Sequence, residues 1–396
     1  MAHFQLLVLT LLNFAVAAEK DGAFVGLANN DSLVIRSPPN GQVLINGADI
    51  RLLVDTVEAL KHQVDTLHRK IDGQQCTVAT DLSITTGSSG LHGWIDGVLA
   101  SNGRIYGIPH NAASVLIIDP RTNAVDVTSI SGLPGSLKWC GGVLADNGKI
   151  FGIPYSANSV LVIDPLSNTA DTSIAVPGGD FKWWGGVLAA NGKIYGIPYY
   201  ATSVLIIDPV SNTVDMTTIS VPSGQNKWVN GVLASNGKIY SVPMRYTAVL
   251  VIDPLTNAVD FTSITGLGQG EKWWGGVMAA NGMIYGIPGF ATSVLIIDPA
   301  TNTSDMTSIT GLSGSSKWLG GIMADSGKIY GIPSHASSVL IIEPTTNTAV
   351  AVGADLTGDY KWAGGVLASN GRIYGIPTTS PSVLVIQSTC TLPGEL

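Results

Sequence analysis

One pattern returns seven times along the chain and limits its fold more than any other feature. Each copy contains an Ile-Pro or Val-Pro pair and, ahead of it, a Trp that precedes a Gly-rich step. The Trp residues are spaced by 44 or 45 positions, at Trp94, Trp139, Trp183, Trp228, Trp273, Trp318 and Trp362. A fixed period of this length is typical of folds built from equivalent units that pack on one another.

Each copy predicts four short strands. In the third copy they are expected at residues 185–189, 193–197, 203–207 and 215–219. Asn191-Gly192 is a two-residue hairpin turn between the first two strands, and Asp208-Pro209 begins a tight turn before the last. Four antiparallel strands repeated at this spacing describe the blades of a β-propeller. The expected fold class is therefore all-β, a seven-bladed β-propeller of four-stranded blades over residues 74–396.

The two ends of the repeat region predict how the ring closes. The seventh copy stops soon after Val383–Ile386 and has no fourth strand, whereas Asp81-Leu82-Ser83-Ile84 upstream matches the fourth strand of the first copy. The N-terminal strand should therefore complete the last blade. Cys76 and Cys390 align with the tip of a missing hairpin, so we expect a disulfide there in an oxidising compartment, worth roughly 5 kcal/mol in the chain-entropy model. Cys140 is expected to be a buried, inert thiol.

The repeated sequence motifs resemble those of a known group of propellers. "SVLIIDPxTNxVDxTSI" followed by "GGVLAxNGxIYGIP" is similar to the YVTN-type repeat of extracellular surface proteins. The layout also resembles the propellers of streptogramin lyases and related lactonases. The resemblance covers residues 76–390 and is specific for fold rather than activity. Streptogramin lyases use a His and an acidic residue with a divalent metal, and no His here can be aligned with such a motif.

Three segments precede the repeats. Residues 1–18 resemble a signal peptide, with a short apolar run and an Ala15-Val16-Ala17 cleavage site, so a secreted, extracellular protein without a membrane span is expected. Residues 19–47 suggest a short β-hairpin that pairs 32–36 with 42–45. Residues 48–73 predict a coiled-coil oligomerisation helix, because Ile50, Val57, Val64 and Ile71 alternate with Leu53, Leu60 and Leu67. Dimer and trimer both stay open, as does packing of this helix on its own propeller.

Charge argues against one class of partner. Only 12% of the residues are charged, the formal net charge is −8, and no basic tract occurs. Nucleic acid is therefore not expected as a partner.

Aromatic and polar residues vary at loops that share one face of the ring. Aromatic rings with hydrogen-bonding neighbours suit sugars, and the Lys before each later repeat Trp would assist anionic groups. The recurrent Trp residues themselves are expected to act as wedges between blades. The ligand-binding candidates are His110, Trp184, Tyr199, Tyr200, Arg245, Tyr246, Trp274, Phe290 and His335.

Two positions break the Gly-Gly step near the mouth of the central channel. Asp96 in the first copy and Asn230 in the fourth replace the first glycine, in blades that lie roughly opposite each other. Such a cluster would hold a divalent metal or polarise a substrate, although simple drift of the repeat explains the same residues. No catalytic residue, metal ligand or cofactor is assigned, because the chain lacks nucleophile-elbow, phosphate-loop and metal-ligand motifs.

These features favour a secreted multivalent binding protein, lectin-like, with glycan or extracellular protein ligands and self-association through the coiled coil. Near-identical blades would offer several similar pockets per chain, and the coil would multiply them. One alternative is a metal-dependent lyase or lactonase with a single site at the channel. Another is a structural surface-layer or cell-wall protein.

Overall fold

The computed structural model describes residues 24–27, 33–36, 44–45, 48–49, 75–87, 93–353 and 355–391. The chain divides into two compact units, and the larger one, Thr77–Thr389, holds the repeats. Every regular element in the described ranges is a β-strand. Within them no helix is long and apolar enough to cross a membrane. The predicted signal peptide and coiled-coil helix lie outside the described residues.

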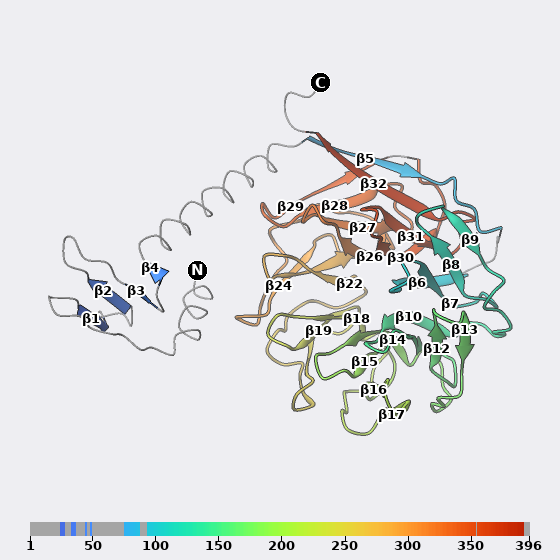
Figure 1. The fold of residues 1–396 in the computed structure, drawn as a ribbon, viewed down its shortest axis with the longest axis horizontal. Coiled ribbons are helices and arrows are strands. Elements are labelled where there is room, and N and C mark those ends of the chain that lie inside the picture. Colours follow the sequence, from blue (N-terminus) through green and yellow to red (C-terminus); the bar gives the residue numbers. More distant parts are fainter. Residues whose placement is uncertain are drawn as a thin grey trace. The chain divides into compact units, whose positions relative to one another are not determined.

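Seven four-stranded antiparallel sheets make up the repeat unit and confirm the propeller. The innermost strands are β6 (Trp94–Leu99), β10 (Trp139–Leu144), β14 (Trp183–Leu188), β18 (Trp228–Leu233), β22 (Trp273–Met278), β26 (Trp318–Met323) and β30 (Trp362–Leu367). The second strands are β7 (Ile105–Pro109), β11 (Ile150–Pro154), β15 (Ile194–Pro198), β19 (Ile239–Pro243), β23 (Ile284–Pro288), β27 (Ile329–Pro333) and β31 (Ile373–Pro377). Figure 1 shows the innermost strands gathered around the middle of the ring.

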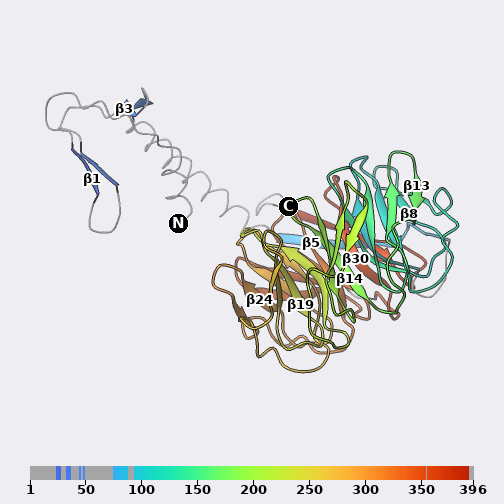
Figure 2. The ribbon, with the colours of Figure 1, turned by 90° about the horizontal axis from the view of Figure 1, so that it is seen from below.

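The outer half of each blade is shorter. The third strands are β8 (Leu116–Asp119), β12 (Leu161–Asp164), β16 (Leu205–Asp208), β20 (Leu250–Asp253), β24 (Leu295–Asp298), β28 (Val339–Glu343) and β32 (Leu384–Thr391). The fourth strands are β9 (Ala124–Asp126), β13 (Thr169–Asp171), β17 (Thr213–Asp215), β21 (Ala258–Asp260), β25 (Thr303–Asp305), β29 (Thr348–Val352) and β5 (Gln75–Asp81). In Figure 2, β14 and β30 lie toward the middle of the ring, with β8 and β13 at its periphery.

The fourth strand of the third blade was wrongly placed by the sequence pattern. It was expected at 215–219 but ends at Asp215. The Asp215 carboxylate accepts the backbone N–H of Thr217 at 2.7 Å and that of Thr218 at 3.1 Å, so a local turn replaces the ladder at this point. The chain returns to the sheet at Ile219, whose carbonyl accepts the N–H of Val204 at 3.0 Å.

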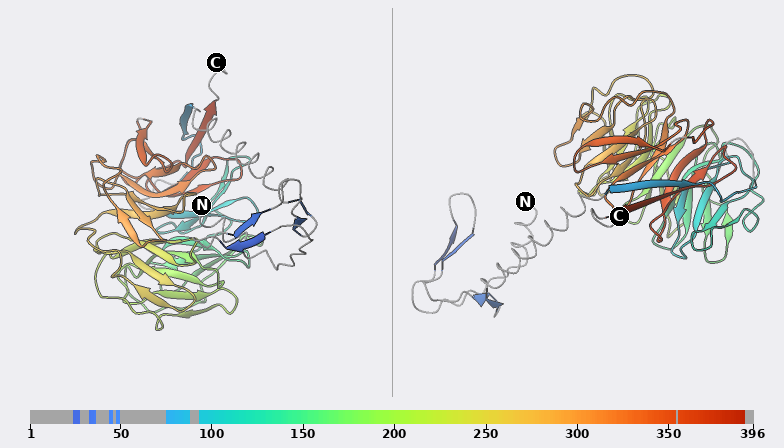
Figure 3. Two further views of the ribbon diagram at one scale, coloured as in Figure 1. Left: turned by 90° about the vertical axis from the view of Figure 1, so that its left-hand side faces the viewer. Right: turned by 90° about the horizontal axis from the view of Figure 1, so that it is seen from above.

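The ring closes as the sequence predicted. β5 is the fourth strand of the sheet β30-β31-β32-β5, so a strand that precedes the first blade completes the last one. Figure 3 shows β5 beside β32. Cys76 lies in β5 and Cys390 in β32, but their side chains fall outside the described residues. The disulfide therefore stays a prediction.

The pairing expected in the N-terminal segment is wrong. β2 (Leu33–Arg36) pairs with β1 (Phe24–Leu27) instead of with residues 42–45. β3 (Leu44–Ile45) pairs with β4 (Ala48–Asp49). The connection between β3 and β4 is only two residues long, and a shorter connection costs less loop-closure entropy.

The recurrent Trp side chains lie between neighbouring blades, as predicted. Trp139 is only 3% exposed and packs in one cluster with Val98 and Ile108 of the first blade and Ile150 of the second. Its indole Nε1 donates to the carbonyl oxygen of Ser159 at 2.8 Å. The same bond, to the residue twenty positions on, recurs at all seven Trp positions. These rings are therefore structural and do not reach a ligand.

A second set of contacts ties a blade to the next at the periphery, at six of the seven junctions in the described part of the chain. The Tyr106 hydroxyl donates to Asn168 Oδ1 at 3.1 Å, and the Asn102 amide donates to the carbonyl oxygen of Pro165 at 3.1 Å. The contact between the seventh and first blades uses the same residue types. Tyr330 breaks the series, because its buried hydroxyl has no hydrogen-bond partner in the described part of the chain. Tyr330 belongs to the sixth blade. The next blade, the seventh, takes its fourth strand from β5 and so lacks the hairpin that joins the third and fourth strands elsewhere.

Candidate functional site

A β-bulge in each innermost strand builds the centre of the ring. In β14, Trp183 pairs with Pro198 and the ladder resumes only at Gly186 with Gly196. Trp184 and Gly185 are left unpaired between these positions. A bulge re-aims the side chains at its site, and a shift of register occurs in all seven blades, one position later in the fourth, where Asn230 and Gly231 are unpaired. The bulges therefore surround the axis with one irregular step from each blade.

One residue of each bulge has a left-handed backbone. The seven positive φ angles run from 49° to 89°, at Asp96, Gly141, Gly185, Asn230, Gly275, Gly320 and Gly364. We call these residues the axial ring. Glycine adopts such angles freely, whereas other residues do so at a cost, with Asp and Asn tolerated best. Asp96 and Asn230 thus hold a conformation that the other five blades reserve for glycine.

The axial ring is tight. A Cβ atom on Gly141 would lie 2.7 Å from the Cα of Gly185, and one on Gly364 would lie 2.6 Å from Asp96 Oδ1. The side chains of Asp96 and Asn230 extend into the space that these glycines leave. Both residues line one small central space of about 20 Å³, which is roughly the room that one water molecule needs. The structure thus brings together the two exceptions that the sequence singled out.

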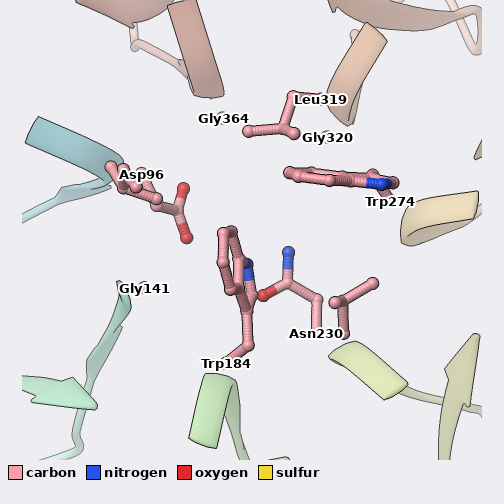
Figure 4. Close-up of a pocket in the computed structure, with 10 residues that line it drawn as sticks. Asp96, Gly141, Trp184, Asn230, Trp274, Leu319, Gly320 and Gly364 are labelled. Carbon is pink, nitrogen blue, oxygen red and sulfur yellow. The ribbon is translucent and has the colours of Figure 1, made fainter. Parts of the chain in front are cut away.

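Figure 4 shows this central space. The Asp96 carboxylate points toward Trp184, and the Asn230 amide lies beyond the same indole. Trp274 stands across from them, and its ring meets that of Trp184 edge to face with centroids 5.5 Å apart. The space is therefore bounded by one carboxylate, one amide and two indole rings.

Burial raises the pKa of Asp96 from 3.8 to about 6. The backbone N–H of Gly97 donates to Oδ1 at 2.9 Å and opposes this shift only in part. Asp96 as a whole residue is half-buried and lines the central space. Its carboxyl group is surrounded by protein atoms. Desolvation without a nearby cation produces a shift in this direction.

Replacing Asp96 with Asn should stabilise the protein near neutral pH. Between pH 4 and 6 the unfolded chain binds fewer protons at this residue than the folded protein, so the free energy of unfolding falls as pH rises. A pKa raised from 3.8 to about 6 makes the ionised carboxylate cost up to about 3 kcal/mol in the folded state. We therefore expect the advantage of Asp96→Asn in urea denaturation to grow from pH 4 to pH 7.

The chain itself provides a control for the Asp96→Asn substitution. Asn230 is the natural residue at the equivalent position and has the same left-handed backbone, so Asn at position 96 needs no new conformation. Carboxylates whose pKa is lowered, such as those of Asp119 and Asp215, titrate in both proteins and cancel in the difference. A stability difference that stays constant from pH 4 to 7 would contradict the assignment of the shift to Asp96.

A larger hollow of about 210 Å³ adjoins the central space on the same face. We call it the cup. Its lining comes from five of the seven residues that follow a recurrent Trp, from five of the seven that follow the Pro of the second strand, and from two loop residues. The lining residues are Ile95, His110, Leu137, Tyr155, Trp184, Tyr199, Trp274, Leu319, Ser334, Tyr360, Ala363 and Thr378.

Aromatic rings concentrate on one side of the cup. Tyr155 meets Trp184 at a centroid distance of 5.2 Å and Tyr199 at 5.8 Å, and Trp184 meets Tyr199 at 5.3 Å. The side formed by the sixth and seventh blades carries the smaller residues Ser334, Ala363 and Thr378. The cup is therefore asymmetric, although the blades that build it are nearly identical.

The candidate residues divide between the cup and its surroundings. His110, Trp184, Tyr199 and Trp274 line the cup. Tyr200 and Phe290 do not line it but support it, since Tyr200 stacks on Tyr199 and Phe290 packs on Trp274.

Three further candidates lie elsewhere. Tyr246 packs on the buried ring of Trp228, at a centroid distance of 4.4 Å. The Arg245 guanidinium pairs with Glu271 at 2.8 Å. His335 contacts the ring of Tyr360 and lies 3.7 Å from Asp359. None of these three lines the cup.

The recurrent Lys residues do not serve a ligand, which corrects the sequence interpretation. Lys138 is 4% exposed, and its Nζ donates to the carbonyl oxygens of His110, Ala112 and Gly135 at 2.9 to 3.1 Å. Its five counterparts are equally buried and bonded to loop carbonyls: Lys182, Lys227, Lys272, Lys317 and Lys361. Five of the six ammonium groups join a loop of the preceding blade to the segment before their own Trp, whereas that of Lys272 bonds to Gly268 and Gly270 of its own segment.

Cys140 lies at the edge of the site and is fully buried. Its Sγ is 3.3 Å from Nδ1 of His110, which is also 3.1 Å from the carbonyl oxygen of Trp139. Burial raises the pKa of the thiol well above its usual value, and the charge of Asp96 adds to the shift. A thiol held in its protonated form is a poor nucleophile, in agreement with the expected inert role.

The residues at the centre do not fit a divalent metal. Among the described residues, no three His, Cys, Asp or Glu side chains come together as a metal site would need. The axial ring offers one carboxylate and one amide, fewer oxygen donors than magnesium or calcium prefers. The His, acid and metal set of the streptogramin lyases is therefore not reproduced by these residues.

Sequence reasoning missed Tyr155 and Tyr360 as parts of the site. Tyr155 occupies the same repeat position as His110 and Tyr199, directly after Pro, so comparison of that one position across copies would have found it. Tyr360 precedes a recurrent Lys, at a position occupied by Leu137 and Phe181 in other blades. The signal was present in both cases, but only the ring shows which repeat positions face the axis.

Comparisons with known proteins identify the fold. No protein-family model matches the chain, and no curated protein matches it at a significant level. A streptogramin B lyase structure matches with a TM-score of 0.64 and 10% identity, over 79% of this chain and 98% of that one. A catalytically inactive virginiamycin B lyase from Staphylococcus aureus with quinupristin matches with a TM-score of 0.63 and 11% identity, over 79% and 99%.

A third match comes from an extracellular protein. The extracellular domain of a putative one-component system from B. thetaiotaomicron has a TM-score of 0.57 and 10% identity, over 79% of this chain and 43% of that one. Identities this low establish shared architecture and not shared activity. The chain is thus a seven-bladed β-propeller that resembles the propellers of streptogramin lyases.

Proposed function

We propose that the protein is an extracellular binding protein that holds one small organic ligand per propeller in the cup. The observation that carries this proposal is where the repeats differ. The second strand reads Ile-Tyr-Gly-Ile-Pro in five of the seven blades, whereas the residue that follows it is His, Tyr, Tyr, Met, Gly, Ser or Thr. Five of these seven varying residues line the cup, so the blades agree where they pack and differ at the positions that build the cup.

The lining favours a ligand with an apolar face. Tyr155, Trp184, Tyr199 and Trp274 supply ring surface, and Ser334 and Thr378 supply polar groups opposite them. Carbohydrates combine such faces with hydrogen-bonding edges and stack on aromatic rings. We propose one ligand in the cup rather than several equal pockets per chain, because lining residues from several blades converge there.

Export and self-association belong to the same proposal. The signal-like segment 1–18 and the heptads of 48–73 support a secreted protein whose cups act together through a coiled coil. A disulfide between Cys76 and Cys390 would suit that compartment. The mass of the purified chain in solution, measured by light scattering, tests the oligomer directly.

The test of the binding function uses a panel of glycans and small organic molecules. Trp184→Leu removes ring surface from the cup but keeps an apolar side chain, so we expect at least a tenfold loss of affinity for any ligand that binds the wild type. Phe261→Leu is the matched control, because Phe261 packs on Tyr246 outside the cup. Calorimetry should give one ligand per chain.

Two results would contradict the proposal. Several ligands per chain would indicate that the repeated loops of the blades, rather than the cup, bind the ligand. Equal affinity of the Trp184→Leu and Phe261→Leu variants would place the ligand outside the cup.

One observation favours a second candidate, a lyase with a single site. A carboxyl group with a pKa of about 6 is suited to proton transfer near neutral pH, and it lies at the centre of a propeller similar to those of lyases. Product formation that is lost in Asp96→Asn would support this candidate. Ligand recovered unchanged after binding would support the first.

A further inference from the structure

The carboxylate at the centre of the ring has no counter-ion in the described protein. Asp96 is the one charged member of the axial ring, and the other six members are glycines and Asn230. The ion pairs among the described residues all involve other carboxylates. The hydrogen bond described for the Asp96 carboxylate comes from the neighbouring backbone N–H of Gly97. Because a partly buried anion is costly without a cation, a ligand that brings one would gain affinity here.

The lysines on this face cannot supply that cation. The Nζ atoms of Lys138, Lys227 and Lys317 each donate to three backbone carbonyls and are held there. No lysine or arginine contributes to the lining of the cup or of the central space. No lysine or arginine side chain of the described residues therefore supplies a positive charge beside Asp96.

The size and the walls of the central space suit one kind of cation. Its volume of about 20 Å³ holds a single water-sized group. Indole faces attract cations, and Trp184 and Trp274 both border the space. An ammonium group has three N–H donors, and the Asp96 carboxylate, which lines this space, is an acceptor for them.

The cup would hold the rest of a ligand whose ammonium group occupies the central space. Ile95, Trp184, Trp274 and Leu319 line both the central space and the cup, so the two adjoin. A ligand that reaches both must carry its charged group at one end and a flat or apolar body at the other.

We propose that the ligand is an organic cation whose primary ammonium group sits against Asp96, between Trp184 and Trp274, with its body in the cup. This inference rests on the proposed binding function and adds the chemical class of the ligand. A quaternary ammonium group is too large for the central space, so the site distinguishes a primary amine from its trimethylated form.

The test compares three probes that share one body: 2-phenylethylamine, 2-phenylethanol and trimethyl(2-phenylethyl)ammonium. Binding to the full chain at neutral pH is measured by calorimetry and by Trp fluorescence. We expect the primary amine to bind at least tenfold more tightly than the alcohol or the trimethylated cation. Asp96→Asn should reduce the affinity for the amine at least tenfold and leave the alcohol unchanged.

A second variant controls for net charge. Asp325→Asn removes one carboxylate from the exposed turn between β26 and β27, at the end of these strands away from Trp318, and should change the affinity for the amine less than twofold. Unchanged binding of the alcohol shows that the Asp96→Asn variant retains its fold.

Equal binding of amine and alcohol to the wild type overturns the inference, as does an amine preference that survives in Asp96→Asn. An uncharged panel molecule that needs Trp184 but not Asp96 would leave the binding function standing and refute the ammonium ligand alone. Failure of the probes and of the whole panel would refute both.

Discussion

Gly141→Ala should lower the free energy of unfolding by about 3 kcal/mol or more, through two effects that add. Gly141 has a φ of 80°, a conformation that costs a residue with a Cβ atom about 1–2 kcal/mol. The new Cβ would also lie 2.7 Å from the Cα of Gly185 in the next blade. That neighbour is backbone held in a sheet, so it cannot rotate away, and the axial ring must widen. Urea denaturation measures the loss.

Gly148→Ala separates these two effects. Gly148 belongs to the same blade and has a φ of 78°, but a Cβ atom there would have nothing within 4 Å. It should cost only the conformational part, about 1–2 kcal/mol. If the two variants lose equal stability, the close approach of the blades at the axis contributes nothing and the account of the ring is wrong.

Lys227→Met should cost about 3 kcal/mol, although methionine fills nearly the same volume. Lys227 is 1% exposed, and its ammonium group donates to the carbonyl oxygens of Tyr199, Ala201 and Gly224 at 3.3, 2.8 and 3.2 Å. Methionine offers no donor, so these acceptors lose their shared partner where two blades meet. Denaturation in urea, followed by Trp fluorescence, gives the change in unfolding free energy.

Lys238→Met is the matched control for charge and size. Lys238 lies in the turn between β18 and β19, and its ammonium makes no hydrogen bond within the described residues. A surface change of this kind should stay within about 0.5 kcal/mol. A Lys227→Met protein as stable as the control would show that the carbonyls find other partners and that the lysines do not hold the loops.

Most of the architecture could be derived from the sequence, because each step depended on local chemistry at a fixed period. The spacing of the Trp residues gave the number of blades, and the truncated seventh copy predicted the strand exchange that β5 makes with β32. Errors arose where a side chain competes with the sheet, as Asp215 does by capping the end of the fourth strand. A strand pattern does not reveal that competition.

The candidate site was only partly predictable. Asp96 and Asn230 were found as exceptions to a Gly-Gly step, and the structure brings both to one central space. The prediction that the recurrent lysines contact a ligand was wrong. The sequence does not show that loop carbonyls of the preceding blade accept hydrogen bonds from an ammonium group such as that of Lys138. Tyr155 was overlooked among the varied loop residues although it lies in the aromatic side of the cup.

The sequence by itself determined the repeating unit, the number of blades and the closure of the ring, since these follow from turn residues and from hydrophobic alternation within each copy. Only the tertiary structure decided which of the varying positions act together. Trp184 and Trp274 are 90 residues apart in the chain but meet with ring centroids 5.5 Å apart, because closure turns equivalent bulges toward one axis. A local pattern specifies a blade, whereas a site made of one residue from each of several blades exists only once the ring is closed.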